Sequence, residues 1–594
     1  MPWPPAPNKL PVVSARTRRV IQFQCWPQRP QESGGLAHTF PRQNLRRLAL
    51  VAITLLVAAP TPGRGAVETV KLPHTAVDTL LLQNGLRALL VENHDAPVAS
   101  VQIWYHVGSK DEQPGKTGFA HLFEHLMFQG TRNLAPEEFS DYIVRVGGLD
   151  NAYTTEDATV LWETVPSSYL PVALWLEADR MRNLQITEQI LKTEREVVKE
   201  ERRERFDNQP YGTVIETLYQ HAFTVHPYRH MTIGSMEDLD RASLADIQDF
   251  YNRYYVPNNA TLVVVGDFQK PAARALIEKY FGPLSPGAQP LAREARSIPA
   301  EPPQTAERVF RTTEDVALPA FVEGYHMPAD GLPDAYALRL AAKILSEGES
   351  SRIYRRLIYD KQIAVQAVST GNFTEDPNLF FVFAVMNEGH APREGEAEVE
   401  AELERLKTEP VLARELDKAK NQVLRDFILS RQSDQSRGEE LGYAAVVLKD
   451  PDLLDAELDR FLAVTPEDIK RVAKKYFVPQ NLTLVEIAPG KNRTRDGDSG
   501  LGFAAKGVGN EAGMCPGING FTRCAPIADW IRWGSQKEES GRAVKALPYN
   551  CPGPRLIAQG SGQRSGTKPE CVLESTVSLG VLPSRIGPYR PDQK

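Results

Sequence analysis

One short pattern occurs twice in this chain and constrains its fold more than any other feature. The decapeptide YYVPNNATLV, beginning at Tyr254, returns as YFVPQNLTLV, beginning at Tyr476. A helix-start signal precedes each copy, with Ser243 as the capping residue of the first and Thr465 as that of the second. Helix, Pro-Asn turn and β-rich strand therefore occur in the same order twice. A repeated unit of this kind predicts two homologous domains.

The repeat sets the predicted domain boundaries within the 594 residues. We predict an N-terminal domain at residues 67–282, a proline-rich linker at 283–303 and a C-terminal domain at 304–490. Strand patterns occur at Leu80–Val91, around an Asn-Gly turn, and at Ala99–Val107. Helical patterns follow at residues 118–128, 135–146, 168–183 and 187–205. The predicted fold class is α+β, with a mostly antiparallel sheet packed against helices in each domain.

The two ends of the chain differ from this regular middle. Arg46 and Arg47 precede the apolar run Leu48–Ala59 and a small-residue exit, which is typical of a secretory signal peptide and too short to span a bilayer. We assign residues 1–66 to this signal peptide and to the segment that precedes it. That segment, residues 1–43, has no periodicity and is rich in proline, which indicates that the start codon has been assigned too far upstream. Residues 491–594 have no sustained period and are predicted to form a tail of low order. We expect a periplasmic or secreted protein without a stable membrane span after signal removal.

Charge and cysteine content exclude several classes of function. The chain has 69 basic and 76 acidic residues, a net charge of −7, and so lacks the basic field that binds nucleic acid. Its five cysteines lie outside the two predicted domains, at Cys25, Cys515, Cys524, Cys551 and Cys571. The domains therefore contain no thiol nucleophile, thiolate metal site or disulfide. The four cysteines of the tail also lack the closely spaced pairs that a zinc site needs.

The segment GFAHLFEHLMF carries the residues best suited to metal chemistry. His121 and His125 stand at i and i+4 of a predicted helix, so both imidazoles lie on one face and could share a metal ion. Glu124 lies beside that face, where a carboxylate can take a proton from a metal-activated water. A histidine pair at this spacing also occurs in ordinary buried or surface positions. The HxxEH pentapeptide as a whole, however, is a zinc-peptidase signature.

A third protein ligand is expected from a second helix. The segment TEREVVKEER supplies Glu194 and Glu201, which lie seven residues apart and therefore on one face of a helix. A charge-rich helix of this kind is also typical of a solvated surface with internal ion pairs. From spacing alone, both glutamates remain candidates for the third metal ligand.

From His74 to Pro489 the sequence resembles the inverzincins, the zinc peptidases of the pitrilysin, insulin-degrading and mitochondrial-processing-peptidase type. The matching motifs are HLFEH at His121–His125, FQGT at Phe128–Thr131, Gly147-Gly148, NAYT at Asn151–Thr154, the Glu194–Glu201 segment, HPY at His226–Tyr228 and the segment Tyr254–Asp267. The resemblance implies two homologous domains that form half of a clamshell chamber.

The resemblance also implies roles at the metal. His121 and His125 would bind one Zn²⁺ per chain, with Glu201 as the third ligand and Glu200 as the alternative if the register differs by one. Glu124 would be the general base. Two histidines and a carboxylate accept several divalent metals, so cobalt and manganese remain alternatives to zinc.

Two further assignments follow from the same resemblance. Glu194 would be an auxiliary acidic residue beside the metal and part of the catalytic set. Asn151, Ala152, Tyr153 and Thr154 would form an edge strand that pairs with the backbone of an extended peptide substrate. An ordinary core strand is the competing interpretation of these four residues.

The second domain departs from the pattern. Arg339, Ala342 and Lys343 stand where the first domain has His121, Glu124 and His125, so we expect no metal there. Members of the family commonly donate an arginine and a tyrosine from the non-metal domain, and Ile358 and Val365 occupy those places here. We therefore predict a homologous partner subunit that carries the Arg/Tyr pair.

Together these features predict a zinc-dependent endopeptidase that hydrolyses peptides or unfolded polypeptide segments. A catalytically silent structural or assembly subunit of a heterodimer is the alternative, because the Arg/Tyr pair is missing. A processing peptidase with a narrow substrate range differs from a degradative one only in its substrate.

Overall fold

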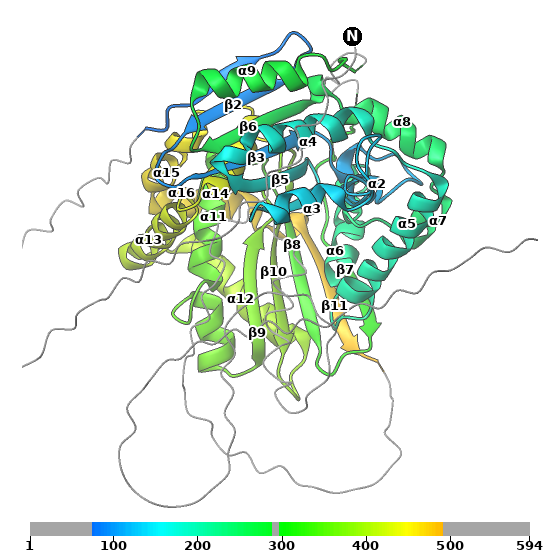
Figure 1. The fold of residues 1–594 in the computed structure, drawn as a ribbon. Helices are drawn as coiled ribbons and strands as arrows, with labels where there is room; N and C mark the ends of the chain where they lie inside the picture. Colours follow the sequence, from blue (N-terminus) through cyan, green and yellow to red (C-terminus); the bar gives the residue numbers. More distant parts are fainter. Residues whose placement is uncertain (1–73, 288–295, 297, 491–594) are drawn as a thin grey trace, which may run out of the picture. The chain divides into compact units, whose positions relative to one another are not determined.

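The structure, a computed structural model, describes residues 74–287, 296 and 298–490 (Figure 1). The predicted leader at residues 1–66, the predicted tail and all five cysteines lie outside these residues. The described residues contain two sheets, one in each half of the chain, with helices packed around them. This arrangement confirms the predicted α+β class.

The first sheet has six strands in the order β1-β2-β6-β3-β5-β4. Its neighbours are antiparallel except for β2 and β6, which run parallel. The strands are β1 (Asp78–Leu81), β2 (Arg87–Glu92), β3 (Val98–Tyr105), β4 (Leu149–Thr154), β5 (Thr159–Pro166) and β6 (Ala260–Gly266). The tight turn between β1 and β2 contains Gly85 at φ +88°, as the Asn-Gly pair predicts.

The second sheet repeats this topology with one strand fewer, in the order β7-β11-β8-β10-β9. Again one pair, β7 with β11, is parallel and the others are antiparallel. The strands are β7 (Arg308–Glu314), β8 (Ala320–Met327), β9 (Ala364–Gly371), β10 (Asn378–Met386) and β11 (Leu482–Pro489). Strand β11 occupies the same place as β6, which confirms that the sequence repeat reflects a structural repeat.

Helices surround both sheets. Those of the first half are α2 (Phe119–Leu126), α3 (Glu138–Arg145), α4 (Leu170–Asn183), α5 (Glu188–Arg202), α6 (Val214–Ala222), α7 (Met236–Arg241), α8 (Leu244–Tyr254) and α9 (Lys270–Phe281). Those of the second half are α11 (Pro333–Ser346), α12 (Pro392–Thr408), α13 (Ala413–Leu429), α14 (Asp434–Val446), α15 (Leu453–Ala463) and α16 (Pro466–Tyr476). Within the described residues, none of the helices has the length and apolar character needed to cross a membrane.

The repeated decapeptide forms the same local structure in both halves. Ser243 and Thr465 cap α8 and α16 with reciprocal capping-box hydrogen bonds, as the sequence predicts. After each helix an asparagine side chain ties the turn to the sheet. Asn259 donates to the carbonyls of His106 (3.3 Å) and Tyr254 (2.9 Å), and Asn481 makes the equivalent pair of hydrogen bonds in the second half.

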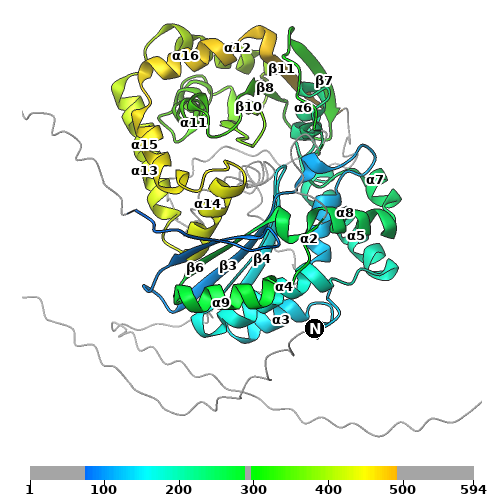
Figure 2. The ribbon, with the colours of Figure 1, turned by 90° about the horizontal axis from the view of Figure 1, so that it is seen from above.

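The two halves exchange helices. Helix α6 of the first half packs its apolar side on the second sheet, where Leu218 meets Gly324 of β8. Helix α14 of the second half packs in turn on β3 and β6 of the first sheet (Figure 2). A side chain at Gly442 of α14 would come within 2.2 Å of the Trp104 ring, so glycine permits this close approach. Each half therefore buries apolar side chains of one of its helices against the sheet of the other half.

Candidate metal centre

Helix α2 presents its polar residues toward α5 and β4. Its apolar residues Phe119, Leu122, Phe123 and Leu126 recur at helical spacing and are buried in the core of the first half. This packing fixes the helix and leaves His121, Glu124 and His125 on the side that contacts α5 and β4.

Helix α5 brings two glutamates to the same place. Thr187 caps its first turn by accepting from the Ile190 N–H, and Leu191 and Val198 anchor it in the core. Glu194 Oε2 lies 3.6 Å from His125 Nδ1, so this carboxylate is beside the second histidine. The facing surfaces of α2 and α5 therefore gather two imidazoles and two carboxylates.

Three of these side chains have the spacing of a metal site. Glu201 Oε2 lies 3.6 Å from His121 Nε2 and 3.2 Å from His125 Nε2, and one ligand atom of each residue lies within 4.8 Å of the other two. Two ligands of tetrahedral zinc, each about 2.1 Å from the ion, are about 3.4 Å apart. Two imidazoles and one carboxylate at this spacing fit Zn²⁺. Glu200, the alternative ligand, instead pairs with Arg203 at 2.7 Å and has a 58% exposed side chain.

The electrostatics of the cluster favour a bound cation. Burial lowers the pKa of His121 to about 4, so this imidazole is neutral at pH 7. Burial also disfavours the charged form of His125, but hydrogen bonds with Glu194 and Glu201 raise its pKa to about 9. Burial opposes ionisation of Glu201, yet His125, His121 and Arg205 lower its pKa to about 2. A cation between these groups would replace the proton on His125.

Glu124 lies next to this cluster and is held from β4. Thr154 Oγ1 donates a hydrogen bond of 2.8 Å to Glu124 Oε2. Burial raises the pKa of Glu124, although the Thr154 hydrogen bond lowers it. A carboxylate with a raised pKa and a fixed orientation is suited to proton transfer.

Strand β4 forms one edge of the first sheet. In the described residues it forms ladder pairs with β5 alone, and it also contacts α2 and α3. Asn151 is exposed, Ala152 is buried, and Tyr153 and Thr154 are half-buried. The structure therefore brings Thr154 into contact with the α2 residues and places the other three along the same edge strand.

Sequence reasoning missed two supporting residues. Arg205 Nη1 lies 2.9 Å from Glu201 Oε1, a contact that the i, i+4 spacing could have suggested. Glu112 accepts hydrogen bonds of 2.8 Å from the backbone N–H groups of Gly118 and Ala120, and so satisfies the first turn of α2. No local pattern marks Glu112, because it lies before the helix rather than at its capping position.

The second half uses the equivalent positions for ion pairs. In α11, Arg339 pairs with Asp330 at 2.7 Å, and Lys343 pairs with Glu347 at 2.6 Å and Asp426 at 2.9 Å. The described part of this half contains no second group of metal-ligating side chains like that on α2 and α5. Val365, at one of the places expected for the Arg/Tyr pair, is a half-exposed residue of β9.

Comparison with known proteins agrees with this geometry. Residues 87–235 match the family described as insulinase (peptidase family M16), and residues 241–423 match the peptidase M16 inactive domain. The zinc protease PqqE of Helicobacter pylori is 34% identical over 420 residues, covering 69% of this chain and 93% of that protein. A probable mitochondrial-processing peptidase subunit beta of Arabidopsis thaliana is 25% identical over 427 residues, covering 70% and 79%.

A solved structure shows the same fold. The crystal structure of a protease from Helicobacter pylori aligns with a TM-score of 0.67 and 33% sequence identity, covering 70% of this chain and 100% of that one. The extent of these matches, together with the HxxEH helix and its facing glutamate, shows that the chain belongs to the M16 family of insulinase-type peptidases.

Proposed function

We propose that this protein is a zinc-dependent endopeptidase that hydrolyses peptides or unfolded polypeptide segments. The observation that carries the proposal is the approach of Glu201 to within 3.2 Å and 3.6 Å of the two HxxEH histidines. Relatives named zinc proteases share this part of the chain, which supports the same chemistry here.

Each residue of the site has a role in this proposal. His121, His125 and Glu201 would hold one Zn²⁺, which when bound polarises a carbonyl and lowers the pKa of a water molecule. Glu124 would take a proton from the attacking water and pass it to the leaving amine, because its raised pKa favours proton transfer in both directions. Glu194 would hold His125 in place through its 3.6 Å contact.

The substrate would bind as an added strand. Strand β4 lies at the edge of the described sheet and ends at Thr154, which contacts Glu124. An extended peptide hydrogen-bonded along Asn151–Thr154 would therefore carry its backbone past the general base. Main-chain pairing of this kind is weakly selective for sequence, which suits an enzyme that acts on varied peptides.

We further propose that the chain works with a homologous partner subunit in the periplasm or outside the cell. The second half has Ile358 and Val365 where the resemblance to the family leads us to expect an arginine and a tyrosine, so a partner would supply that pair and close the chamber. The leader-like pattern at residues 46–66, outside the described residues, supports export.

Metal analysis and a peptide assay test these proposals together. We expect the full chain to bind one zinc per molecule and to hydrolyse a fluorogenic peptide when a homologous partner is present. A chain that binds no stoichiometric zinc, or hydrolyses nothing with its partner, would instead be the silent assembly subunit. A homodimer with full activity would contradict the partner proposal.

A further inference from the structure

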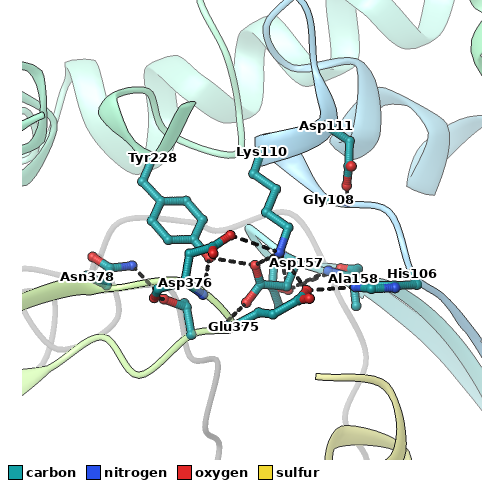
Figure 3. Close-up of polar contacts among 12 residues, drawn as sticks. His106, Gly108, Lys110, Asp111, Asp157, Ala158, Tyr228, Glu375, Asp376 and Asn378 are labelled. Atoms are coloured by element: carbon teal, nitrogen blue, oxygen red, sulfur yellow. Dashed lines mark hydrogen bonds and ion pairs between the residues drawn. The ribbon is translucent and has the colours of Figure 1, made fainter. Parts of the chain in front are cut away.

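A buried lysine lies where the two halves of the chain meet. Lys110 Nζ is 2.7 Å from Asp157 Oδ1 and 2.6 Å from Glu375 Oε2 (Figure 3). It also lies 3.5 Å from Asp376 Oδ2, and its own side chain is only 2% exposed. Asp157 belongs to the turn between β4 and β5, whereas Glu375 and Asp376 belong to the turn between β9 and β10 of the second half.

Direct hydrogen bonds connect the same two turns. The Glu375 N–H donates to Asp157 Oδ2 at 2.8 Å, and Tyr228 Oη donates to Asp157 Oδ1 at 2.6 Å. The Asp376 N–H donates to Tyr228 Oη at 3.2 Å, so the tyrosine bridges both halves. Because unpaired buried carboxylates are costly, the positive charge of Lys110, together with the contacts of Glu375 with His106 and Lys449, helps these acidic turns to approach one another.

The backbone of Lys110 also holds the turn after β4. The N–H of Ser109 donates to Thr155 O at 3.1 Å, and the N–H of Lys110 donates to Glu156 O at 3.0 Å. A side chain at Gly108 would come within 2.4 Å of the Glu156 backbone, so the two segments are in direct contact. The turn follows immediately after Thr154, which donates to Glu124.

The same short segment supports the start of α2. Two residues after Lys110, the carboxylate of Glu112 accepts from the N–H groups of Gly118 and Ala120. Residues 108–112 therefore contact both the turn that follows the edge strand and the beginning of the helix that carries His121 and Glu124.

We infer that Lys110 is a positioning residue for the peptidase site, and that the Glu375-Asp376 turn of the second half holds it in place. The inference rests on the proposed function, and it gives the half that lacks a metal group a direct part in that function. Catalytic groups must be held within about 0.5 Å of their productive geometry. In enzymes generally, a misplacement of about 1 Å can cost about a hundredfold in rate, so a shift of the Thr154–Glu124 contact should slow catalysis.

Hydrogen exchange of the full chain tests the mechanical connection without any activity assay. The variant Glu375→Gln changes only the second half, and we expect faster amide exchange in peptides that cover residues 149–158 of the first half. Lys343→Met is the control for loss of an ion pair inside the second half, because Lys343, like Lys110, pairs with more than one carboxylate, but both of its partners belong to the second half. Exchange at 149–158 that stays unchanged in Glu375→Gln, or rises equally in the control, would overturn the inference.

Kinetics then test the effect on the site. With its partner present, Lys110→Met or Glu375→Gln should lower kcat about tenfold to a hundredfold while zinc content stays at the wild-type level. Lys343→Met should keep the wild-type kcat. If Lys110→Met does not fold, Glu375→Gln alone decides the result.

The outcomes separate this inference from the proposed function. A wild-type protein that hydrolyses nothing contradicts the proposed function, whereas the hydrogen-exchange result still decides whether the second half holds the β4 turn. An active wild type with fully active Lys110→Met and Glu375→Gln variants contradicts the positioning role alone.

Discussion

At the scale of single residues, the candidate metal centre combines two proposed ligands and the proposed base on one helix. His121 and His125 provide imidazole nitrogens toward Glu201, whereas Glu124 between them turns toward Thr154 of β4. Because the ligands and the proposed base have different partners, their substitutions should have different effects on metal content and on catalysis.

Substitution of the proposed base should separate chemistry from metal binding. We expect Glu124→Gln to keep one zinc per chain and to lose about 10²-fold to 10⁴-fold in kcat, the usual contribution of general acid-base catalysis. Metal analysis and a fluorogenic-peptide assay measure both quantities. Glu196→Gln on α5 is the control, because this carboxylate is 57% exposed and outside the metal cluster. Turnover that persists in Glu124→Gln would exclude the role of base.

Substitution of a ligand should have the opposite signature. We expect His125→Ala to lose the bound zinc together with activity, because two remaining ligands hold the ion far more weakly than three. His390→Ala, a change at an outlying histidine that pairs with Glu394 in the second half, should retain both. Unchanged zinc stoichiometry in His125→Ala would contradict the proposed ligand set.

Sequence reasoning reached the α2 residues because their geometry is local. The i, i+4 spacing of the histidines fixes their common face whatever the rest of the fold does. The contact between Thr154 and Glu124 was not predicted, since it depends on where β4 lies relative to α2. The contact between Lys110 and Glu375 was even less predictable from sequence, because the two residues lie 265 positions apart and no periodicity connects them.

At the scale of elements, α2 is positioned by its first residues. Gly118 precedes the helix at φ +90°, and a side chain there would come within 2.7 Å of the Ile233 carbonyl. Glu112 accepts hydrogen bonds from the first turn, so the helix cannot shift along its axis without losing them. The sequence predicted the helix to within two residues at each end, but it did not predict these supports, which come from segments outside the helix.

The start of α2 should therefore be sensitive to a single methyl group. We expect Gly118→Ala to lower stability by about 1–3 kcal/mol, the usual cost of a strained backbone conformation, and to weaken zinc binding. Gly115→Ala is the matched control, because Gly115 has a similar φ of +82° but nothing within 4 Å of an added side chain. Thermal unfolding of both variants measures the cost of backbone strain, and zinc titration of both variants measures the effect of a displaced α2 on the metal site. Equal zinc affinity in the two variants would contradict the positional explanation.

At the scale of the whole molecule, the two described halves are held together by packing contacts between them as well as by the connecting chain. Helices α6 and α14 each cover the sheet of the other half, and the Lys110 cluster adds a polar connection between them. The repeat in the sequence predicted two similar domains with similar sheets. It did not predict which sheet α6 and α14 cover, because an apolar periodicity shows that a helix has a buried face but not which sheet that face contacts.

This polar connection should make the protein sensitive to acid. Burial opposes ionisation of Glu375, but the His106 hydrogen bond and the Lys110 charge hold its pKa well below the ordinary value of 4.5. Lys449 Nζ, at 2.7 Å from Glu375 Oε1, adds a second lysine, while the carboxylate of Asp157 lies on the other side of Lys110. The folded state therefore binds fewer protons at Glu375 than the unfolded state below about pH 4.5.

The sign of the effect follows from this difference in proton binding. The stabilisation from Glu375 is fully present at neutral pH and declines as the pH falls below about 4.5, where the unfolded chain takes up the proton first. Thermal unfolding of the metal-free protein from pH 7 to pH 4 measures it without interference from zinc release. Wild type should unfold at a higher temperature than Glu375→Gln at pH 7, and the difference should shrink toward pH 4. If the difference in unfolding temperature between wild type and Glu375→Gln stays constant over this pH range, the ionised form of Glu375 does not stabilise the folded protein.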